Sequence, residues 1–201
     1  SDLGMEGSAG LYVRGGGPDQ NLILLDGVPV YNVDHLLGFF SVFTPEAVKK
    51  VTLFKSSFPA RFGGRLSSVI DVRTNDGDMK NYHGVVSVGL LTSKINFEGP
   101  IIKNRTSFNI SARRSYIDLL AKPFMPKDEK YSYYFFDVNA KINHKFSDRS
   151  RLFLSAYNGK DHFMTKYDDT YYGDEDKYRD GGKMNWGNTI VSGRWNYIFN
   201  N

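Results

Sequence analysis

Residues 134–146 read YFFDVNAKINHKF, and the alternation in this stretch decides the fold. One set of alternate positions is apolar, and it comprises Tyr134, Phe136, Val138, Ala140, Ile142 and Phe146. The positions between them are mostly polar, and they are Phe135, Asp137, Asn139, Lys141, Asn143 and Lys145. Successive side chains of a strand point to opposite faces, so this pattern predicts a β-strand with one apolar face and one wet face.

The same period of two recurs on both sides of this stretch. It predicts six antiparallel strands, near residues 83–91, 94–99, 104–115, 133–146, 151–162 and 184–199. Tight links are expected around Thr92 and at 99–104 and 147–150, whereas 116–132 and 163–183 are long and polar. Short turns on one rim and long loops on the other are typical of outer-membrane β-barrels, although the short link at Thr92 departs from that rule.

Six strands are too few for a membrane barrel. Several of the predicted strands approach the 9 to 11 or so residues that a tilted strand needs to cross the hydrocarbon. Natural membrane barrels begin at about eight strands. We therefore expect the sequence to be a fragment whose remaining strands lie beyond Asn201.

The chain before residue 78 has a different, glycine-rich character. An apolar run at 22–25 ends at Asp26 and Gly27, a pair that favours a hairpin turn because glycine tolerates positive φ. Thr44, Pro45 and Glu46 have the order of an N-cap, a first-turn proline and a first-turn acid, which predicts a short helix to about residue 49. With strands near 51–54 and 66–72 and a linker at 75–78, the sequence divides into a mixed α/β domain at 1–77 and a strand domain at 78–201.

Composition excludes several classes of function. Cysteine is absent, which removes disulfides and thiol chemistry, and the net charge of +4 comes from bases interspersed with acids rather than from a polybasic patch. Nucleic-acid binding is therefore not expected. No run approaches the 18 to 20 or so apolar residues of a membrane-spanning helix. The mean hydropathy of −0.43 suits a soluble protein and a membrane barrel equally well.

Two long motifs resemble the plug of TonB-dependent receptors: VRGGGPDQN at 13–21 with LLDGVPVY at 24–31, and FPARFGGRLSSVIDV at 58–72. The segments EGPI at 98–101 and SARRSY at 111–116 are similar to a subgroup with an extra carboxypeptidase-like regulatory domain at the N-terminus. The resemblance covers nearly the whole chain. It implies a mainly β fold in the cell outer membrane, with a partial mixed α/β plug domain followed by the first six antiparallel strands of a transmembrane β-barrel.

The resemblance implies energised uptake of a large ligand, without chemistry on that ligand. The ligand class stays open among siderophore, vitamin, glycan and peptide. The implied partners are TonB and its inner-membrane motor, whose binding segment is not in this sequence, together with outer-membrane lipid and, as a further candidate, a surface lipoprotein. No cofactor is expected.

The resemblance also assigns roles to particular residues. Plug loops that rise toward the exterior and contact ligand would include Gly17, Pro18, Asp19, Gln20, Tyr31, Asn32, Asp34 and His35, which otherwise are solvated turns. Arg14 and Arg65 would pair with carboxylates of the barrel wall, since a buried guanidinium needs such a partner; the alternative is a surface arginine. Trp195, Tyr197 and Phe199 suit an aromatic girdle at the membrane interface, with a soluble sandwich core as the alternative.

Other signals fail. Gln20 stands where a dinucleotide fingerprint needs a third glycine, and the four histidines lack paired metal spacing. The acids between 168 and 180 do not follow a calcium-loop order, so no metal site and no enzyme is predicted. The main rival interpretation is a soluble or surface-attached β-rich carbohydrate-binding module. A passive porin is a second rival, disfavoured by the plug-like first domain.

Overall fold

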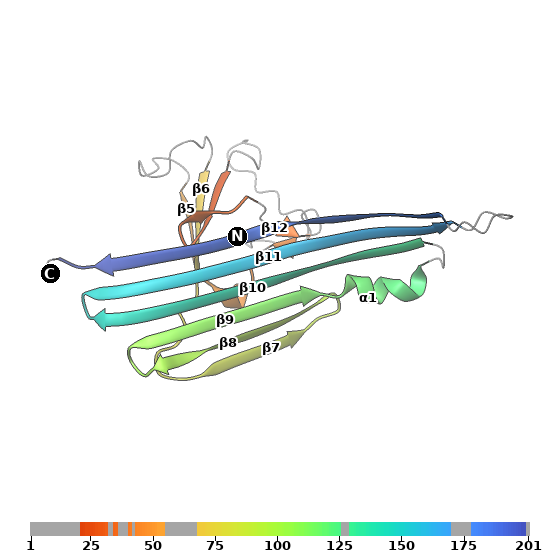
Figure 1. Ribbon diagram of the computed structural model, residues 1–201. Coiled ribbons are helices and arrows are strands. Elements are labelled where there is room, and N and C mark those ends of the chain that lie inside the picture. The colour runs from red at the N-terminus through yellow and green to blue at the C-terminus, as the bar shows by residue number, and fades with distance from the viewer. Residues whose placement is uncertain are drawn as a thin grey trace.

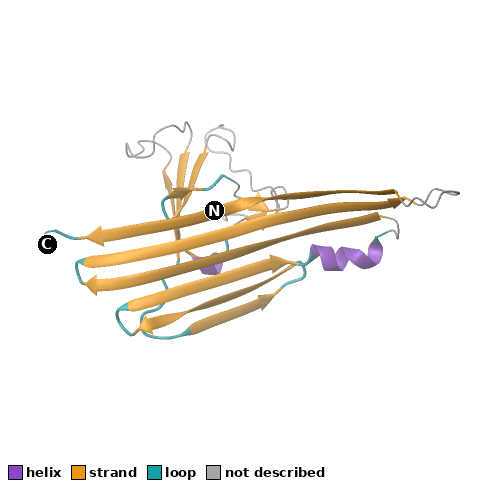
Figure 2. Cartoon of the chain, viewed as in Figure 1, coloured by secondary structure: helices purple, strands orange, loops and turns teal. Residues whose placement is uncertain are grey.

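The computed structural model describes residues 21–31, 34–35, 40–41, 43–54, 68–125, 129–169 and 178–199. The fold is mainly β, with two large sheets and short helical turns (Figure 2). Within these residues, every helix is too short or too polar to cross a membrane.

The larger sheet, called the wall below, has six antiparallel strands in the order β12-β11-β10-β9-β8-β7 (Figure 1). Its strands are β7 (His83–Val88), β8 (Thr92–Ile102), β9 (Thr106–Ser115), β10 (Glu129–Ser147), β11 (Ser150–Asp169) and β12 (Tyr178–Tyr197). The six predicted strands are confirmed, and each pairs with its neighbour in sequence. The end with turns at 103–105 and 148–149 is called the turn rim, and the opposite end the loop rim.

The prediction of two long loops was wrong in extent. The pairing of β11 with β12 runs unbroken from Ser150 opposite Tyr197 to Asp169 opposite Tyr178, through much of the segment expected to be a loop. In the sequence of this segment apolar and polar residues no longer alternate regularly, so the hydrophobic period is lost although the backbone pairing continues. The other segment contains helix α1 (Ile117–Ala121) and the 3₁₀ turn η5 (Lys122–Phe124), both too short to show a helical period.

The smaller sheet has four strands in the order β2-β1-β6-β5. Its strands are β1 (Asn21–Leu25), β2 (Val28–Pro29), β5 (Val48–Phe54) and β6 (Ser68–Thr74). β1 and β6 are parallel, whereas the other pairs are antiparallel. A separate hairpin joins β3 (Asp34–His35) to β4 (Phe40–Ser41). The predicted turn between β1 and β2 is confirmed, with φ of 48° at Asp26 and 89° at Gly27.

The predicted helix after Thr44 is only the 3₁₀ turn η3 (Pro45–Ala47), and the Thr44 side chain makes no capping hydrogen bond. β5 begins at Val48, where the sequence predicted that the helix would continue. Pairing with β6 provides the backbone hydrogen bonds that a longer helix would otherwise make. Tertiary pairing thus overrides the local helix signal.

The two sheets bury opposite kinds of side chain. The four-stranded sheet has an ordinary core, because Leu24, Leu25, Val69 and Val72 are all at most 3% exposed. The wall instead exposes apolar residues on one face, among them Ile95, Ile110, Val138, Ile142, Leu154 and Val191. Its buried face is mostly polar and includes Asn96, Ser107, Asn109, Ser111, Asp137, Asn139, Lys141 and Asn143, although Phe135, Phe153, Tyr157 and Ile190 are buried there as well. The four-stranded sheet stands on this polar side, its strands crossing those of the wall (Figure 1).

The apolar outer face of the wall is a band of limited height. On β11 the outward positions are apolar at Leu152, Leu154 and Ala156, then polar at Asn158 and Lys160. The apolar part of β10, read from the same register, approximates the 9 to 11 residues that cross a bilayer at a tilt. The remaining residues of β10, β11 and β12 extend past the band toward the loop rim.

Candidate functional site

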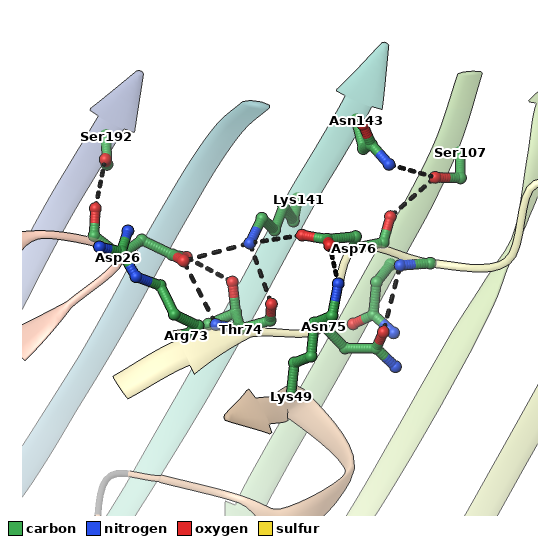
Figure 3. Close-up of polar contacts among 12 residues, drawn as sticks. Asp26, Lys49, Arg73, Thr74, Asn75, Asp76, Ser107, Lys141, Asn143 and Ser192 are labelled. Carbon is green, nitrogen blue, oxygen red and sulfur yellow. Dashed lines mark hydrogen bonds and ion pairs between the residues drawn. The ribbon is translucent and has the colours of Figure 1, made fainter. Parts of the chain in front are cut away.

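The contact between the wall and the four-stranded sheet is built around a buried lysine (Figure 3). Lys141 of β10 is 4% exposed, and its Nζ lies 3.1 Å from Asp26 Oδ1 and 2.9 Å from Asp76 Oδ1. It also donates to the Thr74 carbonyl oxygen at 2.9 Å. Two carboxylates and a carbonyl therefore satisfy all three donors of the ammonium group.

The hairpin turn between β1 and β2 carries the first of these carboxylates. Asp26 also accepts hydrogen bonds from the backbone N–H of Thr74, at 3.3 Å, and from the Thr74 hydroxyl. On β12, the Ser192 hydroxyl donates to the Asp26 carbonyl oxygen at 2.8 Å. One turn of the four-stranded sheet is thereby fixed to two strands of the wall.

The linker at 75–78 carries the second carboxylate. Asp76 pairs with Lys49 of β5 as well as Lys141, and the Ser107 hydroxyl donates to its carbonyl oxygen at 2.8 Å. Burial acts to raise the pKa of Asp76, but hydrogen bonds from Lys141 and Lys49 outweigh it and hold the pKa below its usual value. The amide of Asn75 donates to Glu98 Oε2 on β8 at 2.8 Å. The Asp76 carboxyl is therefore ionised, and the linker is held along the wall before β7 begins.

A second polar cluster is centred on His35, which is 2% exposed. Its Nε2 lies 2.6 Å from Asp137 Oδ1 on β10, and its Nδ1 lies 2.6 Å from Asp161 Oδ2 on β11. Ionised carboxylates only accept hydrogen bonds, and a neutral imidazole donates from one nitrogen only. The geometry therefore requires the doubly protonated ring. Burial acts to lower the pKa of His35, but the hydrogen bonds and charges of Asp137 and Asp161 outweigh it and raise the pKa above 6.5.

Asp137 is also held by the wall itself. Arg113 of β9 donates from Nε to Asp137 Oδ2 at 2.8 Å, and its Nη2 donates to the Ser41 carbonyl oxygen at 2.6 Å. The Tyr157 hydroxyl donates to Asp137 Oδ1 at 2.7 Å. The guanidinium and the imidazolium of His35 together balance two aspartates, so the buried cluster is neutral as a whole.

An aromatic contact completes this cluster. Phe135 occupies a position on the wet face of β10, yet it is fully buried because the His35 ring stacks on it with centroids 4.3 Å apart. The Tyr133 hydroxyl donates to Asp161 Oδ1 on the same face. One apolar side chain in a polar row thus marks the place where the hairpin of β3 and β4 meets the wall.

A small hollow lies beside the His35 cluster, lined in part by Thr44, Glu46, Lys94 and Asn96. Lys94 Nζ pairs with Glu46 Oε1 at 2.5 Å. Burial acts to raise the pKa of Glu46, but the Lys94 contact outweighs it and lowers the pKa. Thr44 Oγ1, Glu46 Oε2 and Asn96 Oδ1 have no hydrogen-bond partner among the described residues. The interface is therefore less tightly paired here than in the two clusters.

The expected ligand-contact residues are only partly described. Tyr31 is 79% exposed, and the backbone of Asp34 lies in β3. His35 was expected at the same apex, but the structure places both its ring nitrogens against carboxylates of the wall. Ligand contact at these positions stays a prediction. Gly17, Pro18, Asp19, Gln20 and Asn32 lie outside the described residues.

Pairing between the first domain and the wall is present, but the described pairs are not the expected ones. Arg14 and Arg65 lie outside the described residues, so their pairing stays a prediction. The pairs that the structure describes join wall Lys141 to two carboxylates and wall carboxylates to His35. In the sequence, Lys141 lies between two asparagines on the wet face of a strand. This pattern could have indicated the first cluster, because a lysine that is covered by protein needs a charged or polar partner.

The three aromatic residues expected to form a girdle lie at the turn-rim end of β12 and just beyond it. Trp195, Tyr197 and Phe199 are 68%, 49% and 81% exposed. Neighbouring rings meet edge to face, with centroids 6.2 Å and 4.8 Å apart. They are not part of a core formed by the described residues, and their place at a membrane interface stays a prediction. Within the same residues, no group of three or more His, Asp or Glu side chains is arranged to hold a metal ion.

One family model matches the first part of the chain. Residues 1–69 match the family model described as TonB-dependent Receptor Plug Domain. No curated protein matches the chain. Solved structures similar to it include the siderophore receptor PirA from Acinetobacter baumannii, with 15% identity, a TM-score of 0.48, and 79% of this chain and 31% of that chain covered.

A ferric enterobactin receptor, PfeA from Pseudomonas aeruginosa, is 13% identical with a TM-score of 0.47, and the match covers 79% of this chain and 32% of that one. PirA from Pseudomonas aeruginosa is 16% identical with a TM-score of 0.47, covering 92% of this chain and 36% of that one. The chain spans about a third of the length of these receptors.

Proposed function

We propose that this chain is part of an outer-membrane receptor that imports a large nutrient by TonB-dependent active transport, because its residues 1–69 match the plug-domain family model of such receptors. The proposed division is a plug at 1–77 and the first barrel strands at 78–201. The proposed partners are TonB with its inner-membrane motor, outer-membrane lipid and a surface lipoprotein. Siderophore, glycan and peptide ligands all suit such a receptor.

The observation that supports this proposal best is the inverted polarity of the wall. Val138, Ile142 and Val191 are 39%, 43% and 76% exposed, whereas the opposite face buries asparagine, aspartate and lysine. Soluble proteins rarely expose a contiguous apolar face of this kind, but a membrane barrel turns its apolar residues toward lipid. A soluble carbohydrate-binding module would bury the face that this wall exposes.

The domain on the inner side favours a gated receptor over a passive porin. The clusters around Lys141 and His35 attach the first domain to β10 and β11 through buried ion pairs, and Ser192 of β12 adds a hydrogen bond. Removing one partner of such a pair costs about 3–5 kcal/mol, because the other charge stays buried without compensation. We propose that these clusters keep the plug closed until force from TonB separates them from the wall.

The experiment uses the full-length receptor in planar lipid bilayers. The wild-type receptor should conduct little, because the plug fills the pore. Lys141→Ala should raise ion conductance and should sensitise cells to large antibiotics, since Asp26 and Asp76 lose their shared cation. Lys160→Ala is the matched control, because Lys160 is exposed on the outer face of the neighbouring strand.

Conductance equal in the wild type and Lys141→Ala would contradict the gating role. A full-length protein that stays monodisperse in buffer without detergent would contradict the membrane location. Ligand uptake that persists after deletion of TonB would contradict active transport.

A further inference from the structure

We propose that the plug-facing side of β10, β11 and β12, between the His35 cluster and the loop rim, is a stacking platform for neutral sugar rings. On this view the imported ligand is an oligosaccharide rather than an anionic siderophore. The inference rests on the proposed function and names the ligand class for the same receptor.

The sheet register brings the rings of this platform together. Tyr133 on β10 lies opposite Phe163 on β11, which lies opposite Met184 on β12. Trp186 lies opposite Asp161, and its ring centroid is 6.4 Å from that of Tyr133. Since Asp161 also binds His35, these side chains share the face of the wall on which the plug sits.

The rings of the platform lie on the opposite face from the apolar band, because Asp161 beside them contacts the plug whereas Lys160 faces outward. These rings are not fully covered: Tyr133, Phe163 and Trp186 are half-buried, and Tyr131, nearer the loop rim, is 37% exposed. Aromatic surface left partly exposed on an inner face suits a recognition surface.

The chemistry of this surface matches a sugar ring. A pyranose has a flat face of C–H groups, which packs on an aromatic ring, and an edge of hydroxyls, which needs neutral hydrogen-bonding groups. Tyrosine and tryptophan provide broad, rigid faces with a polar end. Thr165 and Asn188 add uncharged polar groups on the same face, where Thr165 lies opposite Tyr131 and Asn188 follows Trp186 by two residues.

The charges disfavour an anionic ligand. On the plug-facing side of the described strands from Lys141 to the loop rim, two further cations occur, Lys94 and Arg113. Each is already paired, with Glu46 and Asp137 respectively. In the sequence, segment 163–183 at the loop rim has six acidic and four basic residues. Recognition of an anionic siderophore relies on arginine and lysine with free charge, whereas both of these cations on the plug-facing side of the described strands are already neutralised.

The test is calorimetric titration of the full-length receptor in detergent with defined probes. The neutral probes are maltoheptaose, xylohexaose and mannohexaose, and the anionic probe is ferric enterobactin. At least one neutral oligosaccharide should bind, and Trp186→Ala should weaken it about tenfold, the effect of losing one aromatic stacking contact. Trp186→Phe keeps a ring and should retain most of the affinity, which separates lost stacking from misfolding.

Trp195→Ala is the matched control, because Trp195 is a tryptophan of the same strand on the opposite face, and it should leave affinity unchanged. Binding of ferric enterobactin but of no oligosaccharide would overturn the inference, and so would oligosaccharide binding that Trp186→Ala does not weaken. In either case the receptor could still carry out TonB-dependent uptake, so the proposed function would stand. A protein that needs no detergent would instead refute the proposed function itself.

Discussion

The four-stranded sheet and the wall belong to one chain, yet they sort their side chains in opposite ways. Leu24 and Val72 of the four-stranded sheet are 3% and 2% exposed, as in any soluble core. Val138 and Val191 on one face of the wall are exposed, whereas Asp137 and Lys141 on its other face are buried. The difference teaches that burial follows the neighbouring medium: apolar residues are covered by protein in the four-stranded sheet, and under the proposed function the medium beside the apolar face of the wall is lipid.

The two regions meet through one apolar cluster and several buried ion pairs. Leu25, Val30 and Val72 of the first domain pack with Tyr157 and Ile190 of the wall, and these contacts are non-directional. The charged contacts are centred on Lys141, His35 and Lys94. Such contacts are lost over short displacements, because hydrogen bonds weaken steeply with distance and angle. Polar pairing therefore suits a plug that must be firmly seated and yet removable.

The largest expected effect comes from breaking the contact between the two regions at Asp137. Asp137→Ala leaves His35 with Asp161 as its remaining charged partner and leaves the Arg113 guanidinium with the Ser41 carbonyl oxygen. We expect plug docking to weaken by about 3–5 kcal/mol. The measurement is the urea midpoint of plug release from the receptor in liposomes, with Asp148→Ala in the exposed turn as a control that should change nothing. An unchanged midpoint in Asp137→Ala would show that the cluster does not hold the plug.

A smaller effect is expected when the wall is made to resemble a soluble sheet on its outer face. Ile142→Arg places a charge in the middle of the apolar band and should cost about 2–4 kcal/mol of stability in a bilayer. Thr189→Arg, at the polar edge of the band on β12, should cost about 0–1 kcal/mol. Equilibrium unfolding in lipid vesicles measures both variants. Equal costs would show that the band does not face lipid, and the comparison between the two sheets would fail.

The smallest effect expected is a pH dependence of docking through His35. Its pKa is raised in the folded state, so its contribution is fully present below pH 6.5 and is lost as the pH rises through the raised value. The groups that face the ring are Asp137, Asp161 and Phe135, so deprotonation removes one hydrogen bond and one buried cation.

Conductance of the receptor in planar bilayers should accordingly rise with pH above 6.5. His35→Gln should be leaky at every pH and lose this dependence, because glutamine does not titrate. A pH profile that is the same in both proteins would refute the role of the imidazolium.

Sequence periodicity was a reliable guide to the wall, and a poor guide to its ends. The alternation at 134–146 predicted β10 and its two faces, and Asp26 with Gly27 predicted the hairpin turn. The helix expected after Thr44 is a 3₁₀ turn of three residues, because the residues that follow pair as β5 with β6 instead. The extensions of β11 and β12 were missed because apolar and polar residues do not alternate regularly there.

The candidate site could be predicted only in outline. The aspartates at 26 and 76 were assigned to a turn and a linker, and nothing in their neighbourhood in sequence indicates a lysine 115 residues away from Asp26. His35 was assigned to ligand contact because it follows a plug motif, whereas the structure pairs it with residues 102 and 126 positions away. Pairing across such separations depends on how one sheet docks on the other, and a local pattern does not contain that information.

The sequence by itself determined which residues alternate, where the turns fall and that one face of the wall is apolar, because these features follow from a repeat of two residues along a strand. Only the tertiary structure decided which face is covered, since covering it requires the four-stranded sheet to dock on the polar side. It also decided that Lys141 and His35 are buried and charged, because a charge is stable away from water only where partners from distant parts of the chain converge on it.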